Sequence, residues 1–257
     1  MKNFISILIT NYNKGKFLNK TLRSINTQSF KNFEVIIYDD CSTDNSVEII
    51  KKFKNFKLIK NTKKNNNPSP KNQITGIIKC FKKSKGNLIC LLDADDYFLK
   101  NKLLNVNLFF KKYQKLNCLF DLPKNKNNQF NLKDKKNVKS IWPTIIPTSC
   151  ISFKRNFFLK FIKYAKIGHY YHLEIDARIT IFSKIFYEEY NLLNKKLTVY
   201  NYDENGITAK IHKLTLKWWR RRQEAFLYLK YILKCKNKYF LASFDYMVTR
   251  FVNAVIK

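Results

Sequence analysis

The chain has 257 residues, 45% of them hydrophobic and 16% aromatic, and it carries a formal net charge of +32 at pH 7. This composition excludes a disordered chain, and the length allows one sizeable core or one domain with an appendage. No apolar run is long enough to span a bilayer and no nucleic-acid-binding motif is present, so we expect acidic substrates or an anionic membrane, and no nucleic acid, as partners.

The first hundred residues alternate short apolar runs with amphipathic stretches. The apolar runs predict buried strands at residues 4–9, 34–38, 56–59 and 88–92. Apolar residues at helical spacing predict helices at residues 16–28 and 73–83, and capping side chains at 42–44 predict a helix that runs to residue 53. Strands that alternate with helices indicate a mostly parallel sheet covered on both faces, an α/β fold.

Polar clusters follow three of these strands, at residues 10–12, 39–40 and 93–96. Ligands of parallel sheets bind beyond the carboxyl ends of the strands, so we expect the clusters to converge on one edge. The last cluster holds Asp93, Asp95 and Asp96, whose charges repel each other unless a cation joins them. A hard divalent cation, Mg²⁺ or Mn²⁺, that holds a substrate phosphate is the typical partner. A polar turn that starts a helix is the alternative.

The pattern changes after about residue 115. Residues 121–139 are polar and lysine-rich and predict an exposed loop, and residues 141–153 predict an irregular strand with two prolines. An amphipathic helix is expected over residues 175–186 and a short strand over 197–202. Basic and aromatic helices are expected from residue 214 to the end of the sequence.

Six cysteines are present, and none of them forms a C-x-x-C pair. Reduced, buried thiols in the cytoplasm fit this pattern best. Residues 1–10 contain no small-residue cleavage site, so we expect no signal peptide.

Two stretches of the chain are specific in combination. They are GNLICLLDADDYF at residues 86–98 and ISILITNYNKGKFLNKTLRSINTQSFKNFEVIIYDDCSTDNS at residues 5–46. Together they resemble the family 2 glycosyltransferases of the GT-A fold, whose Rossmann-like, mostly parallel central sheet is flanked by helices. The resemblance is weaker over residues 141–208. It implies a nucleotide-sugar-binding half at residues 1–115, an acceptor-binding half at 116–213, and a basic helical extension at 214–257.

The resemblance places the nucleotide at the first two strand ends. It implies that Thr10 and Tyr12 line the base pocket, with the Tyr12 ring stacked on uracil. Asp40 is expected to accept a hydrogen bond from the base, and Asp39 to face the sugar or to hold the loop; both are otherwise turn formers. Lys71 stands where many relatives have an arginine near the diphosphate, and a solvated lysine is the alternative.

The resemblance also assigns the Asp-x-Asp of Asp93, Ala94 and Asp95 to the donor and its metal ion, Mn²⁺ or Mg²⁺. Asp95 is expected to contact the metal, with Asp93 toward the ribose or a metal-bound water. Asp96 is either a second ligand or a helix cap. His212 is either a further ligand or a surface histidine.

The catalytic base is expected near residue 175, because family 2 enzymes supply an Asp from a later helix. Asp176 is the predicted base, and Glu174 is the second candidate, since the family's Glu-Asp pair is interrupted here by Ile175. A carboxylate that favours a helix start is the alternative for both. Direct attack by the acceptor hydroxyl inverts the anomeric centre.

The predicted function is transfer of a sugar from a nucleotide-diphosphate donor, UDP-linked by preference, to a glycan or lipid-linked acceptor in bacterial surface-polysaccharide synthesis. Residues 216–234 combine aromatic and basic side chains, which suits an anionic membrane surface or packing against the domain. The expected location is the cytoplasm, peripheral at the inner face of the membrane. A nucleotidyltransferase of similar architecture and a non-catalytic basic membrane-binding or nucleic-acid-binding protein are the alternatives.

Overall fold

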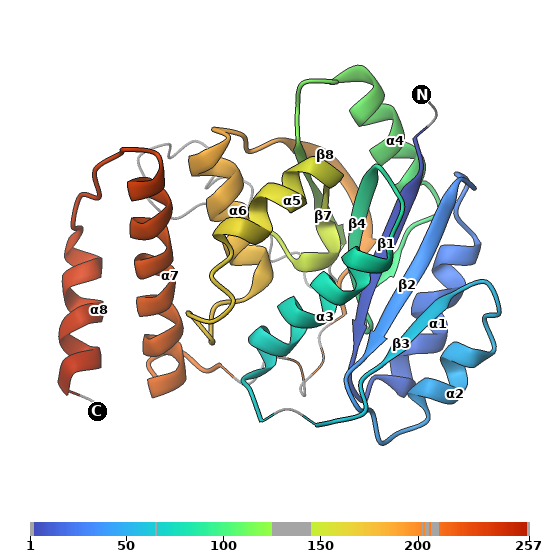
Figure 1. Ribbon diagram of the computed structural model, residues 1–257, viewed down its shortest axis with the longest axis horizontal. Helices are drawn as coiled ribbons and strands as arrows, with labels where there is room; N and C mark the ends of the chain where they lie inside the picture. Colours follow the sequence, from blue (N-terminus) through green and yellow to red (C-terminus); the bar gives the residue numbers. More distant parts are fainter. Residues whose placement is uncertain are drawn as a thin grey trace.

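A sheet of eight strands organises the part of the chain that the computed structural model describes, which is residues 3–64, 66–124, 145–201, 203, 206 and 211–255 (Figure 1). The strand order is β3-β2-β1-β4-β7-β6-β8-β5. The strands are β1 (Ile5–Asn11), β2 (Phe33–Asp39), β3 (Lys57–Lys60), β4 (Leu88–Asp93), β5 (Tyr97–Phe98), β6 (Cys118–Lys124), β7 (Ile151–Lys154) and β8 (Leu192–Val199). The first four in this order are parallel, β7 and β5 run against their neighbours, and β6 is parallel to β8.

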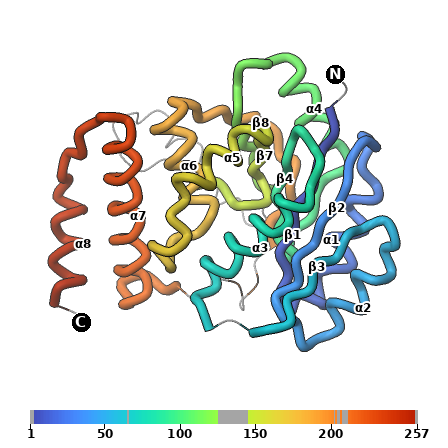
Figure 2. The backbone as a smooth tube through the Cα atoms, viewed as in Figure 1, coloured from blue at the N-terminus to red at the C-terminus, as the bar shows by residue number. Residues whose placement is uncertain are grey.

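Helices cover both faces of this sheet. They are α1 (Gly15–Asn26), α2 (Ser46–Lys51), α3 (Ser69–Lys83), α4 (Lys102–Lys112), α5 (Arg155–Tyr164), α6 (Ile175–Phe186), α7 (Leu216–Cys235) and α8 (Phe244–Val255). The tube in Figure 2 shows α1 and α2 on one side of β1 to β4, and α3, α5 and α6 on the other. The α/β class expected from the sequence, with helices flanking a mostly parallel sheet, is therefore confirmed.

Side chains of each central strand alternate between two hydrophobic cores, as the two-residue period of a strand requires. In β1, Ile5, Ile7 and Ile9 join the core under α1, α2 and α4, whereas Leu8 joins the core under α3, α5 and α6. A strand buried on both faces reads as a continuous apolar run. This is why the early strands could be read from the sequence within one or two residues.

The second half of the chain differs from the sequence-based expectation. Residues 121–124 belong to β6, so the loop predicted from residue 121 is wrong at its start; residues 125–139 lie outside the described residues. The Asp121 carboxylate is fully buried in an ion pair with Lys102, also fully buried, and it accepts a hydrogen bond from Thr198. The sequence shows only the charge of Asp121, which is typical of an exposed loop. It does not show that a partner inside the core neutralises this charge.

The remaining differences are shifts of boundaries. The short strand predicted at residues 197–202 is β8, which begins at Leu192 and ends at Val199. The irregular strand predicted over 141–153 is β7, preceded by the 3-10 turn η2 (Thr148–Cys150); residues 141–144 lie outside the described part. The predicted helix over 175–186 is α6.

All six cysteines are free thiols. Four are buried, Cys41 is half-buried and Cys235 is exposed, so the expected burial holds for the four core thiols. No helix in the described ranges combines the length and the hydropathy that a membrane span needs.

The C-terminal extension is a pair of helices at one end of the molecule, with α8 outermost (Figure 1). The side of α7 that carries Phe226, Tyr228 and Leu229 is buried, and Glu224 accepts a hydrogen bond from the backbone N–H of His172 at 2.7 Å. The packing alternative for this aromatic helix therefore holds for its inner face.

Candidate active site

The ends of three parallel strands lie side by side at one edge of the sheet. Thr10 at the end of β1 pairs with Tyr38 of β2 and with Asp93 of β4, and Asn11 pairs with Asp39. The polar clusters that follow these strands therefore meet, as expected from the sequence.

A cavity of about 1190 Å³ opens at this edge. Its size exceeds the roughly 300–1,000 Å³ of a typical small-ligand pocket, so it has room for more than one small ligand. Its lining combines the β1–α1 and β2–α2 connections, the start of α3, the end of β4, the start of α6, residues after β8, and α7. The lining side chains used below are Thr10, Tyr12, Lys14, Asp40, Gln73, Asp93, Ala94, Asp95, Glu174, Asp176, Asp203, His212 and Arg221.

The predicted base-pocket residues line this cavity. Tyr12 is 45% exposed and lines the cavity, so a ligand there can contact its side chain. Asp40 accepts hydrogen bonds from Asn61 Nδ2 at 2.8 Å and from the Tyr38 hydroxyl at 3.3 Å, both on Oδ1. Thr10 lies beside Gly76 of α3, where a Cβ atom would stand 2.8 Å from its methyl group.

Asp39 is placed differently from its neighbour Asp40. Its side chain is 1% exposed and accepts hydrogen bonds from Asn11 Nδ2 at 2.7 Å, Ser42 Oγ at 2.6 Å and the Ser42 N–H at 3.1 Å. Of the two roles expected from the sequence, this geometry matches holding the loop. Cys41, with φ of 60°, sits in the turn that these bonds fix.

Lys71 lies outside the cavity lining. Its Nζ donates to Asn67 Oδ1 at 2.9 Å and lies 4.3 Å from the centroid of the Tyr171 ring. From the same helix start, Gln73 reaches the cavity and donates to Asp93 Oδ1 at 2.8 Å. The structure therefore brings Gln73, and not Lys71, to the acidic cluster.

Asp93 is held at the end of β4 by two contacts. Its carboxylate accepts from Gln73, and its backbone N–H donates to Ser149 Oγ at 2.9 Å. Burial raises the pKa of Asp93 to about 7, and the nearby charges of Asp95 and Asp176 add to this effect.

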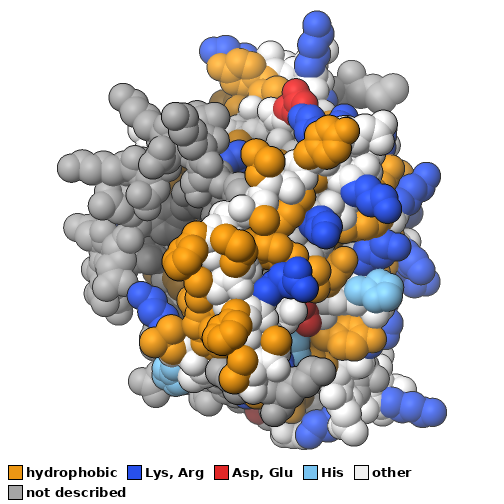
Figure 3. Space-filling model, turned by 90° about the vertical axis from the view of Figure 1, so that its left-hand side faces the viewer, with side chains coloured by type: hydrophobic (Ala, Val, Ile, Leu, Met, Phe, Trp, Pro, Cys, Tyr) orange, Lys and Arg blue, Asp and Glu red, His pale blue; other side chains and the backbone are white. Residues whose placement is uncertain are grey.

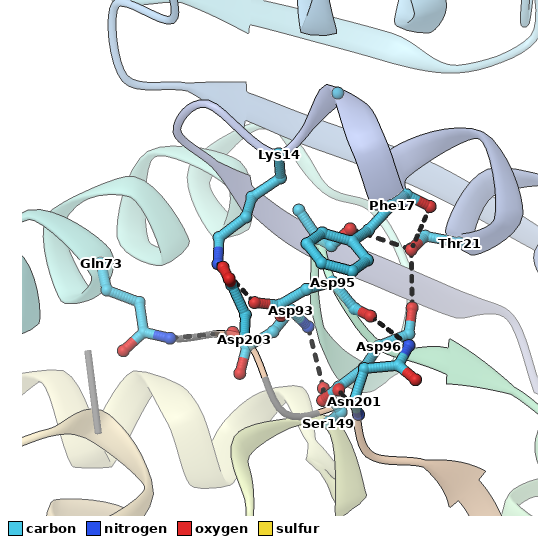
Figure 4. Close-up of polar contacts among 12 residues, drawn as sticks. Lys14, Phe17, Thr21, Gln73, Asp93, Asp95, Asp96, Ser149, Asn201 and Asp203 are labelled. Carbon is cyan, nitrogen blue, oxygen red and sulfur yellow. Dashed lines mark hydrogen bonds and ion pairs between the residues drawn. The ribbon is translucent and has the colours of Figure 1, made fainter. Parts of the chain in front are cut away.

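Asp95 faces a cation that belongs to the chain itself. Lys14 Nζ, from the connection between β1 and α1, lies 2.5 Å from Asp95 Oδ2 and also forms an ion pair with Asp203 (Figure 4). Burial works against the charge of Lys14, but the two carboxylates outweigh it and raise the pKa of the ammonium group. An ammonium group thus stands between two carboxylates that come from sequence positions more than a hundred residues apart.

Asp96 is fully buried and is bonded within the protein. It accepts hydrogen bonds from Ser149 Oγ at 2.6 Å and from the Asn201 N–H at 2.8 Å. Burial, together with Asp93 and Asp95, raises its pKa well above the ordinary value. These contacts join the end of β4 to the residues after β8, and they leave Asp96 outside the cavity lining.

The acidic cluster suits a divalent cation that also binds a substrate. Within the described residues, no group of three or more His, Cys, Asp or Glu side chains is arranged to hold a metal ion. Mg²⁺, however, is commonly held by one or two carboxylates, with phosphate and water as the other ligands. Asp95 and Asp203 already share one cation, so this donor set fits. His212 is exposed at the cavity wall, and among the described residues its side chain forms no ion pair with these carboxylates.

Asp176 lines the same cavity from the first turn of α6, and its charge acts on Asp93. Burial raises its pKa to about 7, the charge of Glu174 adds to the shift, and Arg221 opposes it. Glu174 Oε2 accepts from Arg221 Nε at 2.6 Å, while its Oε1 is buried without a hydrogen-bond partner among the described residues. Both predicted carboxylates therefore reach the site, and α7 contributes a cation that the sequence did not predict.

Four further residues of the site were missed: Lys14, Gln73, Asp203 and Arg221. Lys14 and Asp203 lie inside the stretches that carry the family resemblance, at residues 5–46 and 141–208. Their place in these stretches could therefore have indicated them as site residues. Gln73 and Arg221 carry no signal of this kind, because each depends on how a helix is placed against the sheet.

Comparison with known proteins identifies a family. The model of the family described as "Glycosyl transferase family 2" matches residues 6–186. The "UDP-Glc:alpha-D-GlcNAc-diphosphoundecaprenol beta-1,3-glucosyltransferase WfaP" of Escherichia coli is 38% identical over 102 residues, which cover 39% of this chain and 39% of WfaP. The "Poly(ribitol-phosphate) beta-N-acetylglucosaminyltransferase TarS" of Staphylococcus aureus is 28% identical over 110 residues, which cover 42% of this chain and 19% of TarS. The matched segment is less than half of each relative.

Solved structures match over nearly the whole chain. TarS 1–349 of S. aureus in complex with UDP-GlcNAc aligns with a TM-score of 0.66 at 16% identity, and the match covers 98% of this chain and 71% of that one. The mannosyltransferase PcManGT from Pyrobaculum calidifontis in complex with GDP-Man and Mn²⁺ aligns with a TM-score of 0.61 at 13% identity, covering 98% and 70%. At these identities the likeness shows the fold, and it confirms the GT-A architecture expected from the sequence.

Proposed function

The chain belongs to glycosyl transferase family 2, and from this premise we propose that it is an inverting, metal-dependent glycosyltransferase. It moves a sugar from a nucleotide-diphosphate donor to a hydroxyl group of a glycan or lipid-linked acceptor. The family match leaves the nucleotidyltransferase alternative and the non-catalytic alternative without support.

One observation carries this proposal: a single cavity is lined by Tyr12 and Asp40, by the acidic cluster, and by Asp176. A nucleotide sugar and its acceptor need these three kinds of group, for the base, the diphosphate and the reacting hydroxyl. The acceptor then approaches the sugar from the side of Asp176, opposite the departing diphosphate.

The donor is proposed to be UDP-linked. Tyr12 offers an exposed ring face for uracil, and Asp40 offers a carboxylate that can accept from the imide N–H of this base. Two of the similar proteins support a UDP-linked donor, since WfaP carries UDP-Glc in its name and the TarS structure contains UDP-GlcNAc, whereas the PcManGT structure contains GDP-Man.

Asp95, with Asp203 beside it, would hold the metal ion, Mn²⁺ or Mg²⁺, and Asp93 would face the ribose or a metal-bound water. When bound, the ion supplies positive charge that stabilises the departing diphosphate. The chain's own cation, Lys14, adds a positive charge at the same place. Gln73 orients Asp93, and Asp96 fixes the peptide segment that carries both aspartates.

Asp176 is proposed as the base. It takes the proton of the acceptor hydroxyl while the acceptor oxygen bonds to the anomeric carbon and the bond from that carbon to the diphosphate oxygen breaks. A pKa of about 7 suits a general base that works near neutral pH. Glu174 lines the same cavity, and the ion pair with Arg221 holds its carboxylate near Asp176, whose pKa it raises.

The acceptor is proposed to be a surface-glycan precursor, such as one for lipooligosaccharide or capsule. Two relatives have lipid-linked sugars in their names, WfaP and a dolichyl-phosphate glycosyltransferase of Methanococcus voltae that is 30% identical over 126 residues. The six free thiols suit the reducing cytoplasm, where we place the enzyme.

Nucleotide binding and transfer test this proposal separately. Titration with UDP, GDP and CMP in the presence of Mn²⁺ is expected to show the tightest binding for UDP. Asp176→Asn should abolish transfer and leave UDP binding unchanged, whereas Asp95→Asn should weaken UDP binding in Mn²⁺. Glu48→Gln, an exposed carboxylate on α2, is the matched control and should change neither. If no nucleotide binds, or if Asp176→Asn keeps full transfer activity, the proposal is wrong.

A further inference from the structure

The outermost helix, α8, has two faces of different character. One face packs on α7: Tyr246 and Thr249 are buried, and Asn253 Nδ2 donates to the Trp219 carbonyl at 3.0 Å. The opposite face is an apolar stripe of four exposed side chains, which we call the α8 stripe: Phe244 (78% exposed), Met247 (54%), Phe251 (70%) and Val255 (67%). Spacings of three and four residues place all of them on one side of the helix.

The segment before α8 carries two further exposed apolar side chains. Leu241 is 79% exposed and Tyr239 is 93% exposed. Figure 3 faces this end of the molecule and shows hydrophobic side chains gathered there, with Lys and Arg side chains among them and few acidic ones. No described residue covers the stripe. Contiguous exposed apolar surface on a folded protein marks an interaction site.

Charge decides which partner fits. Residues 214–257 contain ten Lys or Arg residues and two acidic residues, Glu224 and Asp245. Both acidic side chains are engaged within the protein, Glu224 by the His172 N–H and Asp245 by Arg222. A second copy of this chain carries the same charge of +32 and would be repelled, whereas an anionic lipid surface attracts it.

We propose that α8 is an interfacial membrane helix, which lies on anionic lipid with Phe244, Met247 and Phe251 at the boundary between headgroups and acyl chains. Lys and Arg side chains around the α8 stripe then reach the lipid phosphates. The helix does not cross the bilayer.

The packing of α7 connects this surface with the active-site cavity. Arg221 lines the cavity, and the next residue, Arg222, binds Asp245 and Thr249 of α8. Membrane contact through α8 therefore fixes the orientation of the cavity to the bilayer. If the proposed function is correct, this orientation would bring the active-site cavity close to a lipid-linked sugar in the membrane. The membrane contact itself does not depend on that activity.

Sedimentation with lipid vesicles tests the proposal without any donor or acceptor. The protein is expected to bind vesicles that contain phosphatidylglycerol more strongly than vesicles of phosphatidylcholine alone, and salt should weaken the binding. The double variant Phe244→Ser with Phe251→Ser should partition at least about tenfold more weakly, because two large apolar side chains no longer enter the interface. The matched control is Leu108→Ser with Leu159→Ser, which removes two exposed apolar side chains from α4 and α5 and should leave binding unchanged.

Several outcomes would overturn the proposal. Unchanged vesicle binding by the α8 double variant, with an unchanged melting temperature, would show that the stripe is not the contact. Equal binding to both kinds of vesicle would remove the role of anionic lipid. A protein that does not bind vesicles but forms a dimer, which the α8 double variant dissociates, would identify a second copy as the partner.

Discussion

Replacing the proposed base, Asp176, by asparagine is expected to stabilise the fold while it abolishes transfer. The carboxyl group has a pKa of about 7 in the folded protein, against an ordinary value of 3.8. At about 1.4 kcal/mol per pH unit, this difference corresponds to at most about 4 kcal/mol of destabilisation when the group is ionised. Asp176 is half-buried at a solvent-filled cavity, so we expect asparagine to recover about 2 kcal/mol at pH 8.

The raised pKa of Asp176 determines how the stability difference between the variant and the wild type changes with pH. A carboxyl group with a raised pKa binds its proton more tightly in the folded state than in the unfolded state. Between pH 4 and 7 the unfolded chain has therefore lost a proton that the folded chain keeps, and the stability of the wild type falls as pH rises. The gain in the free energy of unfolding from Asp176→Asn should be largest at pH 8. At pH 5 the gain should be roughly a third of the gain at pH 8, and below about pH 4 it should be absent.

Urea unfolding at pH 8 and pH 5, in the presence of EDTA, measures the effect. The control is Asp44→Asn, because hydrogen bonds from the Gly15 and Ser46 N–H groups stabilise the Asp44 carboxylate and its pKa is lowered despite some burial. This control should destabilise the protein by a similar amount at both pH values. The reasoning would be refuted if the Asp176→Asn variant were no more stable than the wild type at pH 8. It would also be refuted if the variant gained as much stability at pH 5 as at pH 8.

Three further predictions follow from particular contacts. Lys14→Met should tighten the binding of Mn²⁺ alone, measured by calorimetry, because the two carboxylates that share the ammonium group lose their internal cation; unchanged affinity would contradict this. Lys102→Met should lower the free energy of unfolding by about 3–5 kcal/mol, because it leaves the buried Asp121 carboxylate unpaired, and adding Asp121→Leu should restore most of the loss in urea titrations. Tyr12→Ala should weaken UDP binding about tenfold through loss of ring stacking, whereas Tyr12→Phe should bind UDP nearly as the wild type does.

The sequence predicted the first four parallel strands well because their physics is local. β1, β2 and β4 are buried on both faces by helices, so they read as apolar runs, and each ends at a polar cluster. β3 lies at the edge of the sheet, where two half-buried apolar residues between exposed lysines were enough to indicate a strand. The later strands are different. β6 contains Asp121, whose burial depends on Lys102 from α4, and a pairing across nineteen residues has no pattern in the sequence.

Some residues of the site could likewise be predicted from the sequence, and others could not. Tyr12, Asp40 and Asp95 follow strand ends, so their sequence positions indicated where they would lie, whereas Asp176 at the start of a helix was indicated by the family resemblance. Contacts between side chains could not be read in this way. Neither the ion pairs of Lys14 nor the hydrogen bond from Gln73 to Asp93 follows from any local period, since each joins segments brought together only by the folded sheet.

The three aspartates of the acidic cluster are neutralised by three different means, and this difference decides which of them can take part in donor binding. Asp96 is bonded to Ser149 and Asn201 in the interior, so a ligand would have to break the structure to reach it. Asp93 has a raised pKa and is held by Gln73, so near pH 7 it carries only part of a charge. Asp95 alone is paired with a side chain that lines the cavity, Lys14, which is 17% exposed. Because a lysine can turn its ammonium group toward a diphosphate without disturbing the backbone, Asp95 is the carboxylate that donor binding can release for a metal ion.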